Sequence, residues 1–137
     1  MFFNARKLSV KPTLDEVQFL MESGYLASDL GRHQQASDIF LGVAALQPND
    51  PTPVAAIGGV LLAAGQINEA VDYLEKALKS FGDEPYLMAH YAEALLFRKE
   101  NARAKEYFLK AMGKSPQGPA ATMARSYIQL IEELEKR

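Results

Sequence analysis

Apolar side chains recur along most of this chain at the spacing of one face of an α-helix. In residues 36–43 they fall at steps of three and four, and the same pattern returns in residues 70–78, 104–111 and 120–134. No stretch alternates apolar and polar residues with the period of two that is typical of a half-buried strand. The pattern therefore predicts an all-α protein.

Start and stop signals divide the pattern into seven helices. Residues 13–16, Thr-Leu-Asp-Glu, form a capping box ahead of the first apolar stripe. Asp50-Pro51 and Asp83-Glu84-Pro85 each place an N-cap residue before a proline at the first helical position. A turn from Pro116 to Pro119 precedes the last helix. We expect six helices up to residue 118 and a seventh after it.

The chain also repeats itself with a period of 34 residues. Six columns hold one kind of residue at this offset: small at Gly24, Gly58 and Ala92; small at Ala36, Ala70 and Ala104; large and apolar at Phe40, Leu74 and Phe108; apolar at Val43, Ala77 and Ala111; and turn-forming at Gly31, Gly65 and Lys99 and at Pro48, Gly82 and Pro116. Only Lys99 departs from its column. A period of 34 with helical spacing predicts stacked helix–turn–helix units.

These columns resemble the signature of the tetratricopeptide repeat, small–x11–Ala–x3–Phe–x7–Pro, which the first unit carries as Gly24, Ala36, Phe40 and Pro48. The resemblance implies a right-handed superhelical solenoid of three repeats, at about residues 17–50, 51–84 and 85–118 within a region of 14–118. It further implies an N-terminal extension at 1–13 and a capping helix at 119–137. The family's usual tryptophan is replaced by other apolar residues, Leu20, Val54 and Met88.

The family resemblance also implies how the columns pack. Gly24 and Gly58 are expected to let paired helices approach closely, with Ala36 and Ala70 opposite them. The large apolar column is expected to fill the wedge between successive units. In the last helix, a stripe is expected to cover the open end of the third repeat; it consists of Tyr127, Ile131 and Leu134.

Composition narrows the functional classes. The 137 residues include no cysteine, which excludes a disulfide framework, a thiolate zinc site and a cysteine nucleophile. The net charge of −2 argues against binding to nucleic acid through phosphate neutralisation. There is no apolar run long enough for a membrane span and no apolar segment of a secretory signal at the start. We therefore expect a cytoplasmic protein whose partners are neither nucleic acid nor membrane.

The charges are unevenly distributed. Residues 1–14 hold three bases and no acid, residues 15–84 eleven acids and three bases, and residues 85–137 nine bases and six acids. An acidic middle between basic ends would steer a charged partner. The alternative is a solvated surface on which the charges cluster by chance.

The candidates for catalytic chemistry are few. Neither His33 nor His90 has a second histidine three or four residues away, so a metal site would need a carboxylate from elsewhere. His90 has Tyr86 one turn before it and Glu93 one turn after it, an arrangement that suits either an acid–base trio or a polar patch in a binding groove. Glycine-rich phosphate-binding motifs are absent. We expect no enzymatic activity, no cofactor and no metal.

In this family, partners bind to the concave surface, which the first helix of each repeat lines. The corresponding positions here are Met21, Tyr25, Ala55, Gly59, Leu62, Ala63, Tyr86, Ala89, His90, Glu93, Leu96 and Phe97. One subclass grips C-terminal carboxylates of heat-shock proteins with lysine, arginine and asparagine, but none of these three stands at the matching places here: Met21, Tyr25, Ala56, Tyr86 and His90. An apolar groove flanked by aromatics suits an amphipathic helix or an extended apolar segment. Alternatively, the protein's own termini or a second copy cover these side chains.

Within the family, the size and layout are most similar to small bacterial type III secretion chaperones. That resemblance implies a bacterial cytoplasmic chaperone that holds a needle or translocator subunit, with a co-chaperone or a second copy as a further partner. A general scaffold or self-associating adaptor is the alternative. The apolar residues of the first segment could pack on the first repeat, occupy the groove or form a dimer contact; they are Phe2, Phe3, Leu8 and Val10.

Overall fold

The structure is a computed structural model that describes residues 11–137, and it confirms the all-α prediction. This part of the chain forms seven helices: α2 (Leu14–Asp29), α3 (His33–Leu46), α4 (Thr52–Ala63), α5 (Ile67–Phe81), α6 (Pro85–Phe97), α7 (Asn101–Lys114) and α8 (Pro119–Glu135). None of these helices is long and apolar enough to cross a lipid bilayer. The expectations for Phe2, Phe3, Leu8 and Val10 lie outside the described residues.

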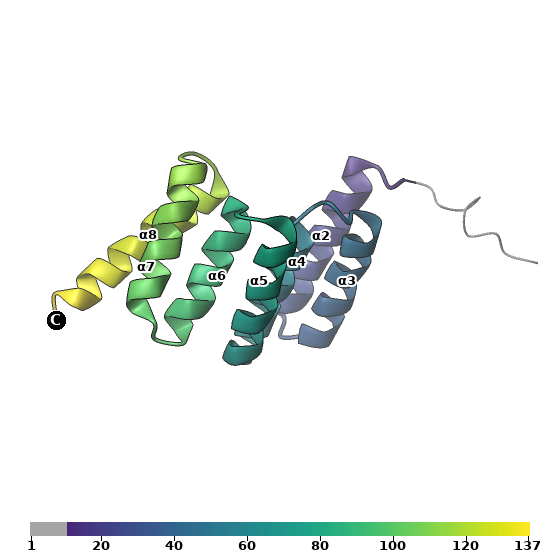
Figure 1. Cartoon of the computed structure of the whole chain (residues 1–137). Helices are drawn as coiled ribbons and strands as arrows, with labels where there is room; N and C mark the ends of the chain where they lie inside the picture. Colours follow the sequence, from purple (N-terminus) through teal and green to yellow (C-terminus); the bar gives the residue numbers. More distant parts are fainter. Residues whose placement is uncertain (1–10) are drawn as a thin grey trace, which may run out of the picture.

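The helices stack in sequence order as a solenoid. Each helix packs against the next, and the alternate helices α2, α4, α6 and α8 also contact one another along the stack. In Figure 1 the row runs from α2 to α8, with α2 and α4 behind α3 and α5. Three helix pairs closed by a final helix therefore form the tetratricopeptide-like architecture that the 34-residue period predicts.

Side-chain caps set where three of the helices begin. Thr13 Oγ1 accepts a hydrogen bond of 3.1 Å from the Glu16 backbone N–H, and the Glu16 side chain accepts in return from the Thr13 N–H, which confirms the capping box. The Glu84 carboxylate accepts from the Leu87 N–H at 2.8 Å. The start of α4 differs from the prediction, because Asp50 caps the Thr52 N–H at 2.9 Å and the helix begins at Thr52, with Pro51 as its N-cap residue.

The turns within the three pairs share one backbone conformation. Gly31 and Gly65 have φ angles of +77° and +80°, and Lys99, in the same column, has φ +67°. Lys99 is the only residue other than glycine with a positive φ among residues 11–137. Lys99, the one residue that departs from its column, therefore adopts the same positive φ as the glycines at the equivalent turns.

The columns of small residues make two kinds of contact. Ala36, Ala70 and Ala104 are fully buried, as expected. A Cβ built on Gly24 would lie 2.4 Å from the Phe40 ring, and one on Gly58 would lie 2.5 Å from Leu74. The nearest neighbour of each glycine is therefore the large apolar residue of its own helix pair. The large apolar column fills the space beside them, within one helix pair, because a ring or a leucine needs the volume that a missing side chain leaves.

The last helix covers the end of the third repeat. The Tyr127 ring stacks on Phe108 with centroids 5.2 Å apart and planes 11° apart, and Ile131 is fully buried. Leu134 is 44% exposed, contrary to the expected stripe. It lies in the last turn of α8, which has 17 residues against the 14 of α7, so the neighbouring helix offers less surface there.

Candidate functional site

A chain of aromatic and polar side chains links three helices on the side of the solenoid that the alternate helices form. Tyr86 meets His90 edge-on with ring centroids 4.6 Å apart. His90 Nδ1 lies 3.6 Å from Glu93 Oε1, and the Tyr127 hydroxyl donates a 2.5 Å hydrogen bond to Glu93 Oε2. Tyr86 lies close enough to Tyr25 of α2 to raise the pKa of Tyr25. We call these five residues the aromatic row.

The spacing along α6 explains why the middle of the row forms. Tyr86, His90 and Glu93 are four and three residues apart, so they share one helix face. Phe97 continues the same face to the last residue of the helix, where it is 52% exposed. The face therefore presents both polar groups and a large exposed apolar side chain.

The two ends of the row are held in place by aromatic contacts. Tyr25 meets Phe40 of α3 edge-on at 5.1 Å, and Tyr127 stacks on Phe108. Aromatic pairs of this kind stabilise a particular ring orientation beyond the area that they bury. The ring of Tyr25 is thus positioned by Phe40 of the same helix pair, and the ring of Tyr127 by Phe108 of α7.

The surroundings of the row raise the pKa of the tyrosines at its two ends, Tyr25 and Tyr127. Burial raises the pKa of Tyr25 well above its usual range, and the neighbouring Tyr86 and Asp50 raise it further. Burial also raises the pKa of Tyr127, with added contributions from its hydrogen bond to Glu93 and from that carboxylate's charge. Phenols that stay protonated remain hydrogen-bond donors at neutral pH. The row is therefore suited to recognition through stacking and hydrogen bonding.

The structure brings together the trio that the sequence singled out. His90 Nδ1 is buried and has no hydrogen-bond partner, since 3.6 Å to Glu93 is too long for one. The Glu93 carboxylate is instead engaged by Tyr127, which the sequence placed only in the capping stripe. Across residues 11–137 no group of three or more histidine, aspartate or glutamate side chains is arranged to hold a metal ion.

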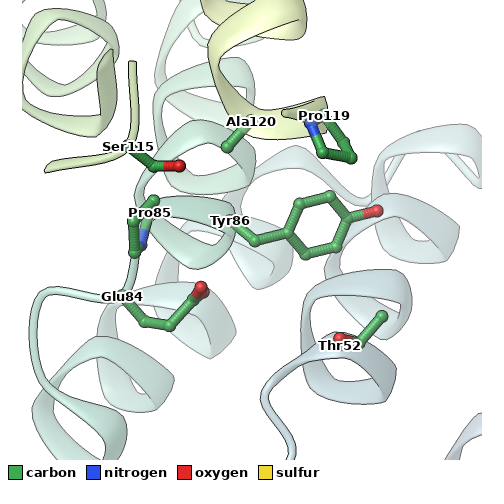
Figure 2. Close-up of a pocket in the computed structure, with 7 residues that line it drawn as sticks. All are labelled: Thr52, Glu84, Pro85, Tyr86, Ser115, Pro119 and Ala120. Atoms are coloured by element: carbon green, nitrogen blue, oxygen red, sulfur yellow. The ribbon is translucent and has the colours of Figure 1, made fainter. Parts of the chain in front are cut away.

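A cavity of about 360 Å³ lies beside the row, where α4, α6 and α8 begin. Figure 2 shows the Tyr86 ring between Pro119 and Thr52. The other lining residues are Glu84, Pro85, Ser115 and Ala120. Because these residues come from three helix starts that are far apart in sequence, no local signal in the chain indicates the cavity.

The predicted groove residues fall into two groups, those that are buried and those with accessible surface. Ala55 and Ala89 are fully buried, so they lie beneath the surface and offer no contact to a partner. Leu62 is half-buried and packs against the larger core cluster, which means that it supports the fold as well. Those with accessible surface are Met21, Tyr25, Gly59, Leu62, Ala63, Tyr86, His90, Glu93, Leu96 and Phe97.

Comparison with known sequences identifies the family. The sequence model of the tetratricopeptide repeat matches residues 61–130, just over half of the chain. The chain belongs to the tetratricopeptide repeat family. No curated protein matches the sequence.

Solved structures with this fold include protein-binding domains from several sources. The Yersinia enterocolitica type III secretion chaperone SycD, in complex with a peptide of the translocator YopD, is 22% identical, with 91% of this chain and 98% of that chain covered and a TM-score of 0.65. PcrH from Pseudomonas aeruginosa is 19% identical, with 88% and 95% covered and a TM-score of 0.67. The first repeat domain of Spaghetti (RPAP3), bound to an HSP90 peptide, is 12% identical, with 93% and 99% covered and a TM-score of 0.67.

Proposed function

We propose that this protein is a chaperone that holds an apolar or amphipathic segment of a type III secretion subunit, a needle or a translocator protein. The binding surface in this proposal is formed by α2, α4 and α6 and comprises the accessible groove residues named above. The observation that carries the proposal is the aromatic row, which joins α2 and α6 to α8 and lies next to open surface on α4.

The surface between the ends of the row has room for a partner. A Cβ built on Gly59, on α4, would meet no side chain or neighbouring helix within 4 Å. Tyr25, on α2, is 40% exposed. Aromatic residues beside small ones provide large contact areas at a low cost in side-chain entropy, and they are frequent energetic centres of protein interfaces. An apolar segment could therefore pack between α2 and α6 over α4.

The chemistry of the surface favours an apolar partner over a C-terminal carboxylate. One subclass of the family carries lysine, arginine and asparagine at the positions that correspond here to Met21, Tyr25, Ala56, Tyr86 and His90, and Ala56 is only 5% exposed. Recognition of a carboxylate by charge needs arginine or lysine at such places. The domain of Spaghetti binds an HSP90 peptide, but this chain has no lysine or arginine at the five positions just named.

The structural relatives support the choice of client. SycD binds a peptide of a translocator, and this chain spans nearly the whole of that chaperone with a similar fold. We extend the same use of the fold to this protein, with the needle and translocator subunits of its own organism as clients.

The proposal is tested by replacing two equally exposed apolar residues, one on a helix of the proposed binding surface and one on a helix outside it. Phe97 on α6 is 52% exposed and Leu109 on α7 is 51% exposed. Phe97→Ser should weaken binding of the purified client subunit at least tenfold in calorimetric titration, about 1.4 kcal/mol, because it removes a large apolar contact. Leu109→Ser, the matched control, should leave the affinity unchanged.

Two results would contradict this proposal. If neither the needle nor the translocator subunit of the organism binds the wild-type protein, the client class is wrong. If the subunit binds and both variants bind it equally well, the surface of α2, α4 and α6 is not the binding site.

A further inference from the structure

The first helix of the solenoid has an exposed apolar face that the core does not use. Phe19 is 67% exposed, and Leu26 and Leu30 are each 59% exposed. They are seven and four residues apart, so they lie on one face of α2. We call these three residues the outer stripe.

The repeat register shows that two of these positions normally lie in an interface. Adding 34 or 68 to residue numbers 19 and 26 gives positions that are at most 3% exposed in the next two repeats: Pro53, Val60, Leu87 and Ala94. Those residues are buried because another repeat precedes theirs. Within residues 11–137 no helix precedes α2, so its outer stripe is an interface surface without a partner.

The charges around the outer stripe favour a basic occupant. Helix α2 carries Asp15, Glu16, Glu22 and Asp29 and no basic residue. A second copy of the chain that docked on this face by two-fold symmetry would bring two such acidic helices together, and like charges at short range oppose that contact. An occupant with positive charge and apolar side chains would satisfy both features.

Residues 1–10, MFFNARKLSV, have this composition. They include four large apolar residues besides Met1, two bases and no acid: Phe2, Phe3, Leu8, Val10, Arg6 and Lys7. Only residues 11–13 separate the segment from α2 in the chain. Ten residues reach at most about 33 Å when extended, whereas the 16 residues of α2 span about 24 Å. The segment is long enough to return along the whole helix.

We propose that residues 1–10 cover the outer stripe, with their apolar side chains on Phe19, Leu26 and Leu30 and their bases beside the α2 carboxylates. In this arrangement the segment does for the first repeat what a preceding repeat does for the other two. Because the segment is tethered to α2, its local concentration at the stripe exceeds that of any free partner.

The natural absence of cysteine makes a spin-label experiment direct. Arg32→Cys carries a nitroxide next to the C-terminal end of α2, and Ser126→Cys carries the control label on the exposed surface of α8, at the other end of the solenoid. The readout is the paramagnetic broadening of the amide signals of residues 2–8 in the full chain. We expect the label at 32 to broaden them at least fivefold more than the label at 126. We expect Phe2→Ser with Phe3→Ser to abolish the difference.

Three results would overturn the proposal. The two labels could broaden residues 2–8 equally. The serine variants could leave the broadening unchanged, which would show that the tether alone brings the segment near the label. The broadening could also occur only between molecules, in a mixture of labelled and isotope-enriched chains, which would identify a second copy as the occupant.

Discussion

Lys99 stands in a backbone conformation that its side chain disfavours. Its φ of +67° matches the +77° and +80° of Gly31 and Gly65 in the equivalent turns. A residue with a Cβ crowds the following carbonyl in this conformation, at a cost of roughly 1–2 kcal/mol, whereas glycine does not. The third repeat therefore carries local strain at its turn.

Lys99→Gly should consequently stabilise the protein by about 1 kcal/mol, despite the added freedom of the unfolded chain. Thermal unfolding followed by circular dichroism would show a higher midpoint. As the control, Lys76→Gly, at an exposed position inside α5, should destabilise the protein by roughly 1 kcal/mol. A midpoint that falls in both variants would show that the turn at Lys99 is not strained.

Gly24 illustrates how a missing side chain can be a packing element. A Cβ at this position would lie 2.4 Å from the Phe40 ring, which is itself fully buried in the core and would have to shift against its packed neighbours. Gly24→Ala should therefore destabilise the protein by about 1–3 kcal/mol, the usual cost of overpacking. Urea unfolding measures the difference.

Gly59 is the matched control for this substitution. It also lies inside a helix, but a Cβ there would meet no side chain or neighbouring helix within 4 Å. Gly59→Ala should stabilise the protein by up to about 1 kcal/mol through helix propensity alone. Equal effects of the two alanines would contradict the close contact between α2 and the Phe40 ring.

At the scale of elements, the two ends of the solenoid differ. Helix α8 covers one end, whereas at the other end the outer face of α2 is exposed. Tyr127 stacks on Phe108, and Ile131 is fully buried against the third repeat. The outer stripe of α2 has no such cover among the described residues. Solenoid ends need a cap because each repeat buries its apolar face only against a neighbour.

Deleting residues 119–137 should therefore expose the surface around Phe108 and make the protein aggregate. Size-exclusion chromatography with light scattering would detect the large species. Deletion of residues 135–137 alone, which are exposed, should leave a soluble protein with the elution volume of the full chain. A folded, soluble protein without α8 would show that this helix has a role other than capping.

At the scale of the whole molecule, the proposed binding surface depends on several helices at once. The aromatic row takes Tyr25 from α2, three residues from α6 and Tyr127 from α8, and the cavity beside it takes residues from three helix starts. The helix stack holds these groups at fixed distances. A partner that contacts the whole row therefore contacts the first repeat, the third repeat and the cap, and its affinity depends on the stack remaining intact.

Much of this architecture was predictable from the sequence. The helices, the capping box at Thr13, the glycine turns and the three stacked units follow from local spacing and from the period of 34. These features depend on contacts within a few residues or between neighbouring repeats, and such contacts leave a regular pattern in the chain. The start of α4 and the exposure of Leu134 differ from the predictions. Both lie at the end of a helix, where the repeating contacts of the stack stop.

Only the tertiary structure decided which of those residues a partner can reach. Ala55 and Ala89 share the groove register with Gly59 and Glu93, yet they are fully buried. Tyr25 and Tyr86 lie close together although 61 positions separate them in the sequence. Phe19 is exposed, whereas the equivalent residues of the later repeats are buried. The sequence pattern is the same in each repeat, but the exposure of a side chain depends on whether a neighbour covers it. That information lies in the position of each repeat within the stack.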